Sequence, residues 1–189
     1  MSETTGKIFL MMSVSLDGFF EGPDREIGWH RVDEEVHAHF NERLSEVAAF
    51  VDGRVTYELM ADYWPTADAD PANAGPTAEF AKIWREVPKY VYSRTMESAA
   101  WNTTVIPEFS PEGVRELKER VGGDIALGGA DLAAHFMRHG LVDEYSLYVN
   151  PVVLGRGRPL FPGDVELDLR LVETRTFGNG VVLLRYLPG

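Results

Sequence analysis

The chain has no cysteine among its 189 residues. This absence excludes a disulfide, a thiolate nucleophile and a zinc–sulfur site. His37 and His39 do not supply a substitute, because they are two positions apart in a predicted helix and therefore face different sides of it. We expect no metal site.

Basic residues are scarce as well. Lys and Arg number 18 against 30 Asp and Glu, so the formal net charge is −12. We expect neither a nucleic-acid nor a membrane partner, because nucleic acids and anionic membranes both require a basic face. A phosphorylated small molecule stays compatible with this charge, since a few arginines and backbone amides make a local positive site.

Long apolar runs are also missing. No run approaches the length that spans a bilayer. The segment Met1–Lys7 lacks the basic flank and the cleavage pattern of a signal peptide, so we expect a cytoplasmic protein. The apolar content of 44% and the length favour a single globular domain over residues 1–189, with an ordered core over about 7–187.

The stretch 124–132 carries the first positive signal. An apolar run meets Gly128 and Gly129, and a helical pattern begins at once. A buried strand would then end beside the first free amides of a helix, where the N–H groups and the helix dipole favour an anion. A tight turn without a ligand explains the two glycines equally well.

Two further stretches have the same character. Gly53 closes a predicted strand, and Arg54 and Thr56 lie in the first turn of the helix that follows. The helix dipole disfavours a cation there, so the arginine indicates an anionic partner. Ser93 and Arg94 follow another predicted strand and form a second possible anion site. The alternative for the first stretch is a surface arginine with a local cap. The alternative for the second is an ordinary polar turn.

A loop follows the predicted N-terminal strand over residues 7–14, a usual place for ligand contacts in α/β proteins. It contains Asp17, Gly18 and Trp29. The alternative for Asp17 is the role of an ordinary turn carboxylate. The alternative for Trp29 is hydrophobic packing.

A second loop is locally basic in an acidic chain. Gly155 and Gly157 flank Arg156, and Arg158 follows. Contact with a phosphate is one reason for such a loop.

Strands and helices alternate along the chain, and a β-hairpin over 167–177 and 181–187 ends it. This order predicts an α/β fold with a mixed, mostly parallel sheet and helices on both faces. Between these elements, residues 66–77 have the composition of an irregular loop and residues 78–85 that of a short helix.

Taken together, these blocks resemble the dihydrofolate reductase superfamily. The matching blocks, in chain order, are Ser15–Gly18, Gly53–Thr56, Ser93–Arg94, Gly128–Leu132 and Leu141–Phe161. The resemblance covers residues 7–187 and is closest to the reductase domain of the bifunctional riboflavin-biosynthesis deaminase/reductase. It implies the three-layer fold of dihydrofolate reductase, an oxidoreductase activity and a homodimer.

The resemblance also implies NADPH as the cofactor and gives roles to residues of this sequence. By similarity, the cofactor contacts are Met12 and Ser13 beside the nicotinamide, Gly53, Arg54 and Thr56 at the phosphates, Ser93 and Arg94 near the 2′-phosphate, and Gly128, Gly129, Ala130, Asp131 and Leu132 around the pyrophosphate. The candidates for the substrate side are Asp17, Gly18, Trp29, Arg156 and Arg158.

The implied reaction is the reduction of the ribosyl C1 of an aminopyrimidine phosphate, with Asp17 or a bound water as proton donor. The chain departs from dihydrofolate reductases in one respect, because Asp33, Glu34 and Glu35 do not match the pattern around their pterin-binding acid. Reduction of dihydrofolate or another pterin, and nucleotide binding without turnover, are therefore the alternatives. The Cys and His zinc signature of a deaminase domain is absent.

Overall fold

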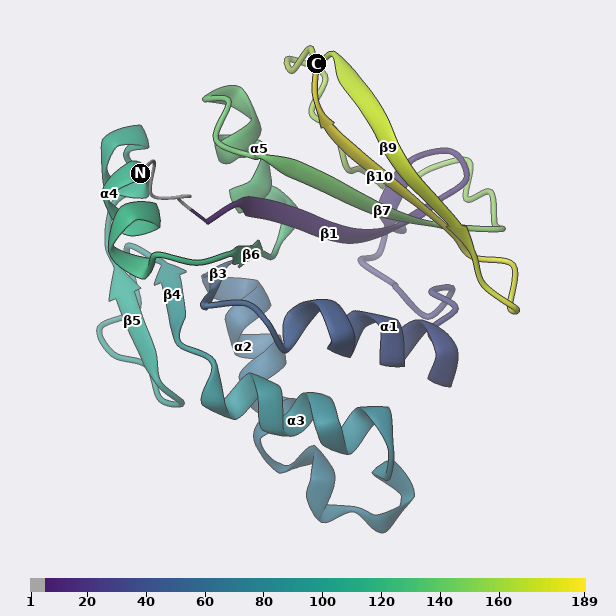
Figure 1. Ribbon diagram of the computed structural model, residues 1–189, viewed down its shortest axis with the longest axis horizontal. Helices are drawn as coiled ribbons and strands as arrows, with labels where there is room; N and C mark the ends of the chain where they lie inside the picture. Colours follow the sequence, from purple (N-terminus) through teal and green to yellow (C-terminus); the bar gives the residue numbers. More distant parts are fainter. Residues whose placement is uncertain (1–5) are drawn as a thin grey trace.

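The structure is a computed structural model that describes residues 6–189, so most of the segment Met1–Lys7 lies outside it. Its centre is an eight-stranded sheet with the order β5-β4-β3-β6-β1-β7-β10-β9 (Figure 1). The strands of this sheet are β1 (Ile8–Ser15), β3 (Ala49–Gly53), β4 (Lys89–Tyr92), β5 (Thr103–Ile106), β6 (Ile125–Leu127), β7 (Glu144–Asn150), β9 (Leu169–Thr176) and β10 (Val182–Pro188).

Strand direction divides the sheet into two parts. The strands from β5 to β7 pair in parallel. Strand β10 runs antiparallel to both β7 and β9, and this forms the C-terminal hairpin. The predicted mixed, mostly parallel sheet is confirmed.

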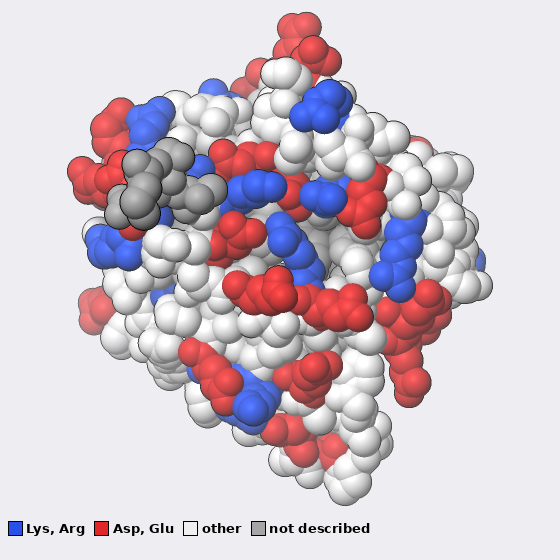
Figure 2. Space-filling view, in the orientation of Figure 1, with Lys and Arg blue, Asp and Glu red and all other residues white. Residues whose placement is uncertain are grey.

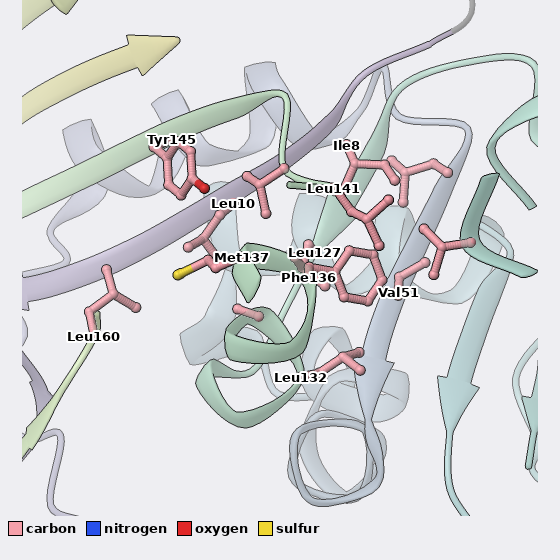
Figure 3. Packing of buried hydrophobic residues seen from close by; sticks show 14 of the residues in the cluster. Ile8, Leu10, Val51, Leu127, Leu132, Phe136, Met137, Leu141, Tyr145 and Leu160 are labelled. Carbon is pink, nitrogen blue, oxygen red and sulfur yellow. The ribbon is translucent and has the colours of Figure 1, made fainter. Parts of the chain in front are cut away.

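Helices cover both faces of the sheet. They are α1 (Glu34–Leu44), α2 (Arg54–Tyr63), α3 (Pro76–Glu86), α4 (Pro111–Val121) and α5 (Ala130–Arg138). Because side chains alternate along a strand, Leu10 of β1 packs with Phe136 and Met137 of α5, as Figure 3 shows. Its neighbour Phe9 packs with Trp84 of α3 on the other face. The three-layer arrangement follows from this alternation.

Two short strands were not expected from the sequence. Strand β2 (Phe19–Glu21) and strand β8 (Arg158–Pro159) lie in segments predicted as loops, and they form a separate two-stranded sheet. Gly157 permits their close approach, because a Cβ at this position would overlap the carbonyl oxygen of Glu21. We call this pair the β2–β8 ribbon.

The predicted loop over 66–77 is also more ordered than expected. It contains two 3₁₀ helices, Trp64–Ala69 and Pro71–Asn73. Helix α3 then begins at Pro76, before the predicted start at 78, because proline is well suited to the first position of a helix.

Charged side chains of both signs are interspersed on the face seen in Figure 2, and Lys and Arg form no continuous surface there. Among residues 6–189, no helix is both long and apolar enough to cross a membrane.

Candidate functional site

The candidate site lies at the edge where the parallel strands have their carboxyl ends. The strand register places Gly53, Tyr92 and Ile106 side by side at the ends of β3, β4 and β5. Strand β6 ends at Leu127, which pairs with Val51, so Gly128 and Gly129 continue beside the end of β3. Open parallel sheets commonly bind ligands at this edge.

Two helices begin at this edge without a side-chain cap. The N-cap residues of α2 and α5 are Gly53 and Gly129, and neither helix start receives a hydrogen bond from its cap side chain. The first amides of both helices therefore have no capping acceptor from that residue. A Cβ on Gly129 would lie 3.9 Å from the nitrogen of Gly53, so the two helix starts converge.

The predicted Gly-Gly turn packs so closely against neighbouring side chains that only glycine fits at either position. Gly129 has φ +80°, and a Cβ there would come within 2.5 Å of Oγ1 of Thr56. A Cβ on Gly128 would overlap Oδ1 of Asp52. Thr56, Gly128 and Gly129 thus pack closely against one another, and we call these three residues the cradle. It brings together residues that are predicted to hold cofactor phosphates.

Beside the cradle lies a cavity of about 600 Å³. Its lining includes five of the predicted cofactor residues, namely Gly53, Ser93, Arg94, Asp131 and Leu132. A cavity of this size admits the adenosine part of a dinucleotide.

The cavity also has walls that sequence reasoning missed. Tyr92, Phe109 and His135 line it, and the ring of Phe109 lies 5.9 Å from that of Tyr92 and 5.5 Å from that of His135. Flat aromatic walls suit a planar base. A sequence signal for part of this wall existed, because residues 107–109 directly follow a predicted strand and so belong at the same edge.

The two residues predicted near the 2′-phosphate differ in their surroundings. The hydroxyl of Ser93 accepts hydrogen bonds from the amides of Thr95 and Met96, so it shapes the turn after β4. Arg94 is exposed on that turn and lines the cavity. The exposed Arg54 donates to Glu58, four residues along α2, at 2.8 Å. Both bonds between the two residues use Nη1 of Arg54, so Nη2 and Nε remain available to a phosphate.

Met12 and Ser13 point to opposite faces of β1. Met12 packs against the cluster that contains α5. Met11 packs on the other face, and Ser13 shares that face because strand residues two apart point the same way. A nicotinamide on one face of the sheet would therefore touch one of these two side chains and only the backbone of the other.

Asp17 holds a loop in place. Its carboxylate accepts hydrogen bonds from the hydroxyl of Ser15 at 2.7 Å and from the amides of Leu154 and Gly155 at 3.1 and 2.7 Å. The bond from Ser15 holds the pKa of Asp17 below its ordinary value, and the two amides add to this effect. An ionised carboxylate is a poor proton donor at neutral pH, so this geometry favours a positioning role. Gly18 follows in a tight turn with φ +86°.

The two arginines of the basic loop have different surroundings. Arg158 donates to Glu21 at 2.7 Å and to Asp131 in the first turn of α5, and its guanidinium lies 5.0 Å from the ring of Phe20. It therefore fastens the β2–β8 ribbon to the edge of the cradle. Arg156 is exposed, and within residues 6–189 no ion pair includes it. The two arginines therefore differ in whether they pair with a neighbouring acid.

Trp29 lies in the loop after β2. Its indole N–H donates to the carbonyl of Glu26 at 3.1 Å, and its ring meets the ring of His30 edge-on at 4.2 Å. Burial lowers the pKa of His30. These contacts make Trp29 part of the packing of its own loop.

Two of the three acidic residues at the start of α1 accept hydrogen bonds from backbone amides. Asp33 caps the helix by accepting from the amide of Val36 at 3.0 Å. Glu35 accepts from the amide of Gly178 at the tip of the hairpin. Glu34 is exposed. None of the three has the environment of a buried pterin-binding acid.

Asp52 is a carboxyl group that sequence reasoning overlooked. It is the last-but-one residue of β3, is 7% exposed and lies against Gly128 of the cradle. Burial raises the pKa of Asp52 to about 7, and the positive charge of Lys89 opposes the rise. In the sequence, Asp52 directly precedes Gly53, a position that is typical of a turn carboxylate.

Comparisons with known proteins agree with this architecture. Residues 6–183 match the model of the RibD C-terminal domain family. The uncharacterized protein YyaP of Bacillus subtilis is 38% identical over 186 residues, which cover 95% of this chain and 94% of YyaP.

Solved structures share the fold at low sequence identity. The diaminohydroxyphosphoribosylaminopyrimidine deaminase/5-amino-6-(5-phosphoribosylamino)uracil reductase of Thermotoga maritima aligns with a TM-score of 0.69 and 15% identity, over 100% of this chain and 58% of that enzyme. The dihydrofolate reductase of Enterococcus faecalis, solved with NADP(H), aligns with a TM-score of 0.65 and 15% identity over 98% of both chains. The dihydrofolate-reductase-like fold is confirmed.

Proposed function

We propose that this chain, which belongs to the RibD C-terminal domain family, is an NADPH-dependent reductase of the riboflavin-biosynthesis type. Its substrate would be a ribosylaminopyrimidine phosphate. The observation that carries the proposal is the convergence of two uncapped helix starts, α2 and α5, beside a cavity with an arginine at its rim.

The residues of the edge fit this cofactor. A Cβ at Gly128 or Gly129 would collide with the side chain of Asp52 or Thr56, so the close approach of the turn to the start of α2 depends on glycine. The aromatic-walled cavity next to it suits an adenine ring, and Arg94 suits a 2′-phosphate. Among residues 6–189, no group of three or more potential metal ligands is found.

The cofactor, when bound, supplies a hydride to an electrophilic carbon. The chain's own share is binding and orientation. The free amides at the starts of α2 and α5 would hold the phosphates, with Thr56 adding a hydroxyl. Asp17 holds the 154–155 segment beside the turn after β1.

We propose that the proton that accompanies the hydride comes from a source other than Asp17. Hydrogen bonds from Ser15, Leu154 and Gly155 stabilise its ionised form, so it holds no proton at neutral pH. A water molecule in the substrate cleft therefore becomes the favoured donor of the two that the sequence suggested. The local roles of Asp33 and Glu35 give no support to dihydrofolate as the substrate.

The proposal is tested by turnover. Purified protein is mixed with NADPH and a panel of ribosylaminopyrimidine phosphates, pterins and small carbonyl compounds, and the loss of NADPH absorbance is followed. We expect oxidation with a ribosylaminopyrimidine phosphate. Binding of NADPH without oxidation by any member would favour a nucleotide-binding protein, and no binding at millimolar NADPH would refute the proposal.

We further propose that the protein acts as a homodimer, in line with the resemblance of its sequence. Sedimentation of the purified chain distinguishes a mass near 21.1 kDa for the monomer from twice that value.

A further inference from the structure

Asp52 is the one buried acid that touches the cradle. Its Oδ1 occupies the space that a Cβ on Gly128 would need, and the methyl group of Thr56 lies 3.7 Å from the same point. The carboxyl is thus placed between the Gly-Gly turn and the first turn of α2. Any ligand held by Gly128, Gly129 and Thr56 must lie next to it.

Within residues 6–189, no ion pair includes the carboxyl of Asp52. Burial raises its pKa, and the charge of Lys89 opposes the rise without a direct pairing. By contrast, the fully buried Glu144 is paired with Lys7, Arg43 and Arg185. A buried acid that lacks such partners favours its neutral form.

The charged groups on the surrounding elements are engaged elsewhere. On β4, the ammonium of Lys89 donates to the carbonyl oxygens of Trp84 and Val87 and lies 4.3 Å from the ring of Trp84. On α2, the exposed Arg54 and Glu58 bond each other.

Two further polar side chains on these helices also have partners. The hydroxyl of Tyr57 on α2 donates to the carbonyl of Ala100. On α5, Asp131 is paired with Arg158. The ammonium of Lys89 acts on Asp52 through its charge, but no ion pair joins the two within residues 6–189.

We propose that Asp52 must carry a proton when the cradle holds a pyrophosphate, so that ligand binding takes up a proton at this carboxyl. The inference rests on the proposed function, because it takes a dinucleotide pyrophosphate as the ligand. Its physical basis is that two anions cannot share a desolvated site without a cation between them. The protonated carboxyl removes this repulsion and offers an O–H donor instead.

The linkage predicts an affinity that falls as the pH rises. Because burial raises the pKa of Asp52 to about 7, the carboxyl is largely protonated at about pH 6 and largely ionised at about pH 8.5. We expect the wild-type protein to bind NADPH at least about tenfold more weakly at the higher pH. The titration of the ligand's own 2′-phosphate also contributes, so a reference protein is needed.

Asp52→Asn supplies that reference, because the amide has the shape of the protonated acid and does not ionise. NADPH binding is measured by fluorescence at both pH values for the wild type, D52N and the control D62N. Asp62 is an exposed acid on α2, the helix that follows the strand of Asp52, so D62N makes the same charge change away from the cradle. We expect D62N to follow the wild type and D52N to keep its affinity at high pH. The same pH profile in D52N and the wild type would overturn the inference.

A calorimetric measurement needs no variant. Binding to the wild type near pH 7 is measured in two buffers of different ionisation enthalpy, first with NADPH and then with inorganic pyrophosphate. We expect uptake of about half a proton with both ligands. Uptake with NADPH alone would assign the proton to the 2′-phosphate or the nicotinamide part and would overturn the inference.

The outcomes separate the two proposals. If NADPH binds and no proton is taken up, the role of Asp52 fails and the proposed function stands. If neither NADPH nor pyrophosphate binds at either pH, the proposed function fails, and the role of Asp52 fails with it.

Discussion

Helices α2 and α5 begin differently from helices α1 and α4. Asp33 and Ser110 cap α1 and α4 with their side chains, and each accepts a hydrogen bond from an amide of the first turn. Gly53 and Gly129 begin α2 and α5 without such a bond. Helix α3 also follows a glycine, but Pro76 at its first position has no N–H to satisfy.

This difference indicates that the starts of α1 and α4 stabilise the fold, whereas those of α2 and α5 are available to a ligand. A side-chain cap satisfies an orphan amide and typically contributes about 1 kcal/mol of stability. The chain omits this contribution at the two helix starts that meet at the carboxyl edge of the sheet. Amides that no side chain occupies are available to an anion, so the omission is what a phosphate site requires.

The largest expected effect comes from filling the cradle. Gly129→Ala introduces a Cβ that comes within 2.5 Å of Oγ1 of Thr56, and it strains a residue with φ +80°. We expect NADPH affinity, measured by fluorescence titration, to fall by about a hundredfold or more, on the scale of several lost charge-assisted hydrogen bonds.

Gly140→Ala is the matched control for this change. Gly140 lies beyond the other end of α5 with φ +62°, and a Cβ there has nothing within 4 Å. It should lose stability, by about 1 kcal/mol in thermal unfolding, and keep its affinity for NADPH. Equal losses of affinity in the two variants would contradict the assignment of the cradle.

The second effect concerns the cavity beside the cradle. Arg94→Ala removes the guanidinium at its rim and should weaken NADPH by about tenfold or more, with little change for NADH, because only NADPH has a 2′-phosphate. Parallel titrations with the two cofactors measure this. A similar loss for both would move Arg94 away from the 2′-phosphate.

The third effect tests the capped helices. Ser110→Ala removes the side chain that accepts the amide of Gly113 at 3.0 Å, and we expect a loss of about 1 kcal/mol in the free energy of unfolding. NADPH affinity should stay the same, because α4 begins outside the proposed site. Chemical denaturation and a binding titration of the same sample give both quantities. A change in affinity would show that capped helix starts also serve the ligand.

The sequence allowed the fold and the cradle to be predicted for a local reason. At Gly53 and at Gly128–Gly129, a strand pattern changes directly into a helix pattern, and both changes are visible within a few residues. The order of these blocks then identified the family. The strand register that places Gly129 beside Gly53 is long-range, but it follows from the fold once that is known.

The rest depends on contacts that no local pattern reveals. The β2–β8 ribbon has only three and two residues per strand, too few for a periodic signal, and it forms because Gly157 lets the two segments meet. The environment of Asp17 is set by the amides of Leu154 and Gly155, more than a hundred positions away. The buried position of Asp52 was equally hidden, since an acid before a glycine is typical of a turn.

The smallest expected effect concerns one exposed ion pair on an uncapped helix and its counterpart on a capped helix. Arg54 bonds Glu58 on the uncapped α2, and Arg115 bonds Glu112 on the capped α4. An exposed pair of this kind is worth about 0.3–0.5 kcal/mol, and the charge of Glu58 in the pair opposes the approach of an anion to Arg54. Glu58→Gln should therefore tighten NADPH binding by about twofold, whereas Glu112→Gln should leave it unchanged. The two variants change the net charge equally, so any general effect of charge cancels between them. Weaker binding in Glu58→Gln would mean that Glu58 orients Arg54 toward the ligand, and the pair would then belong to the site.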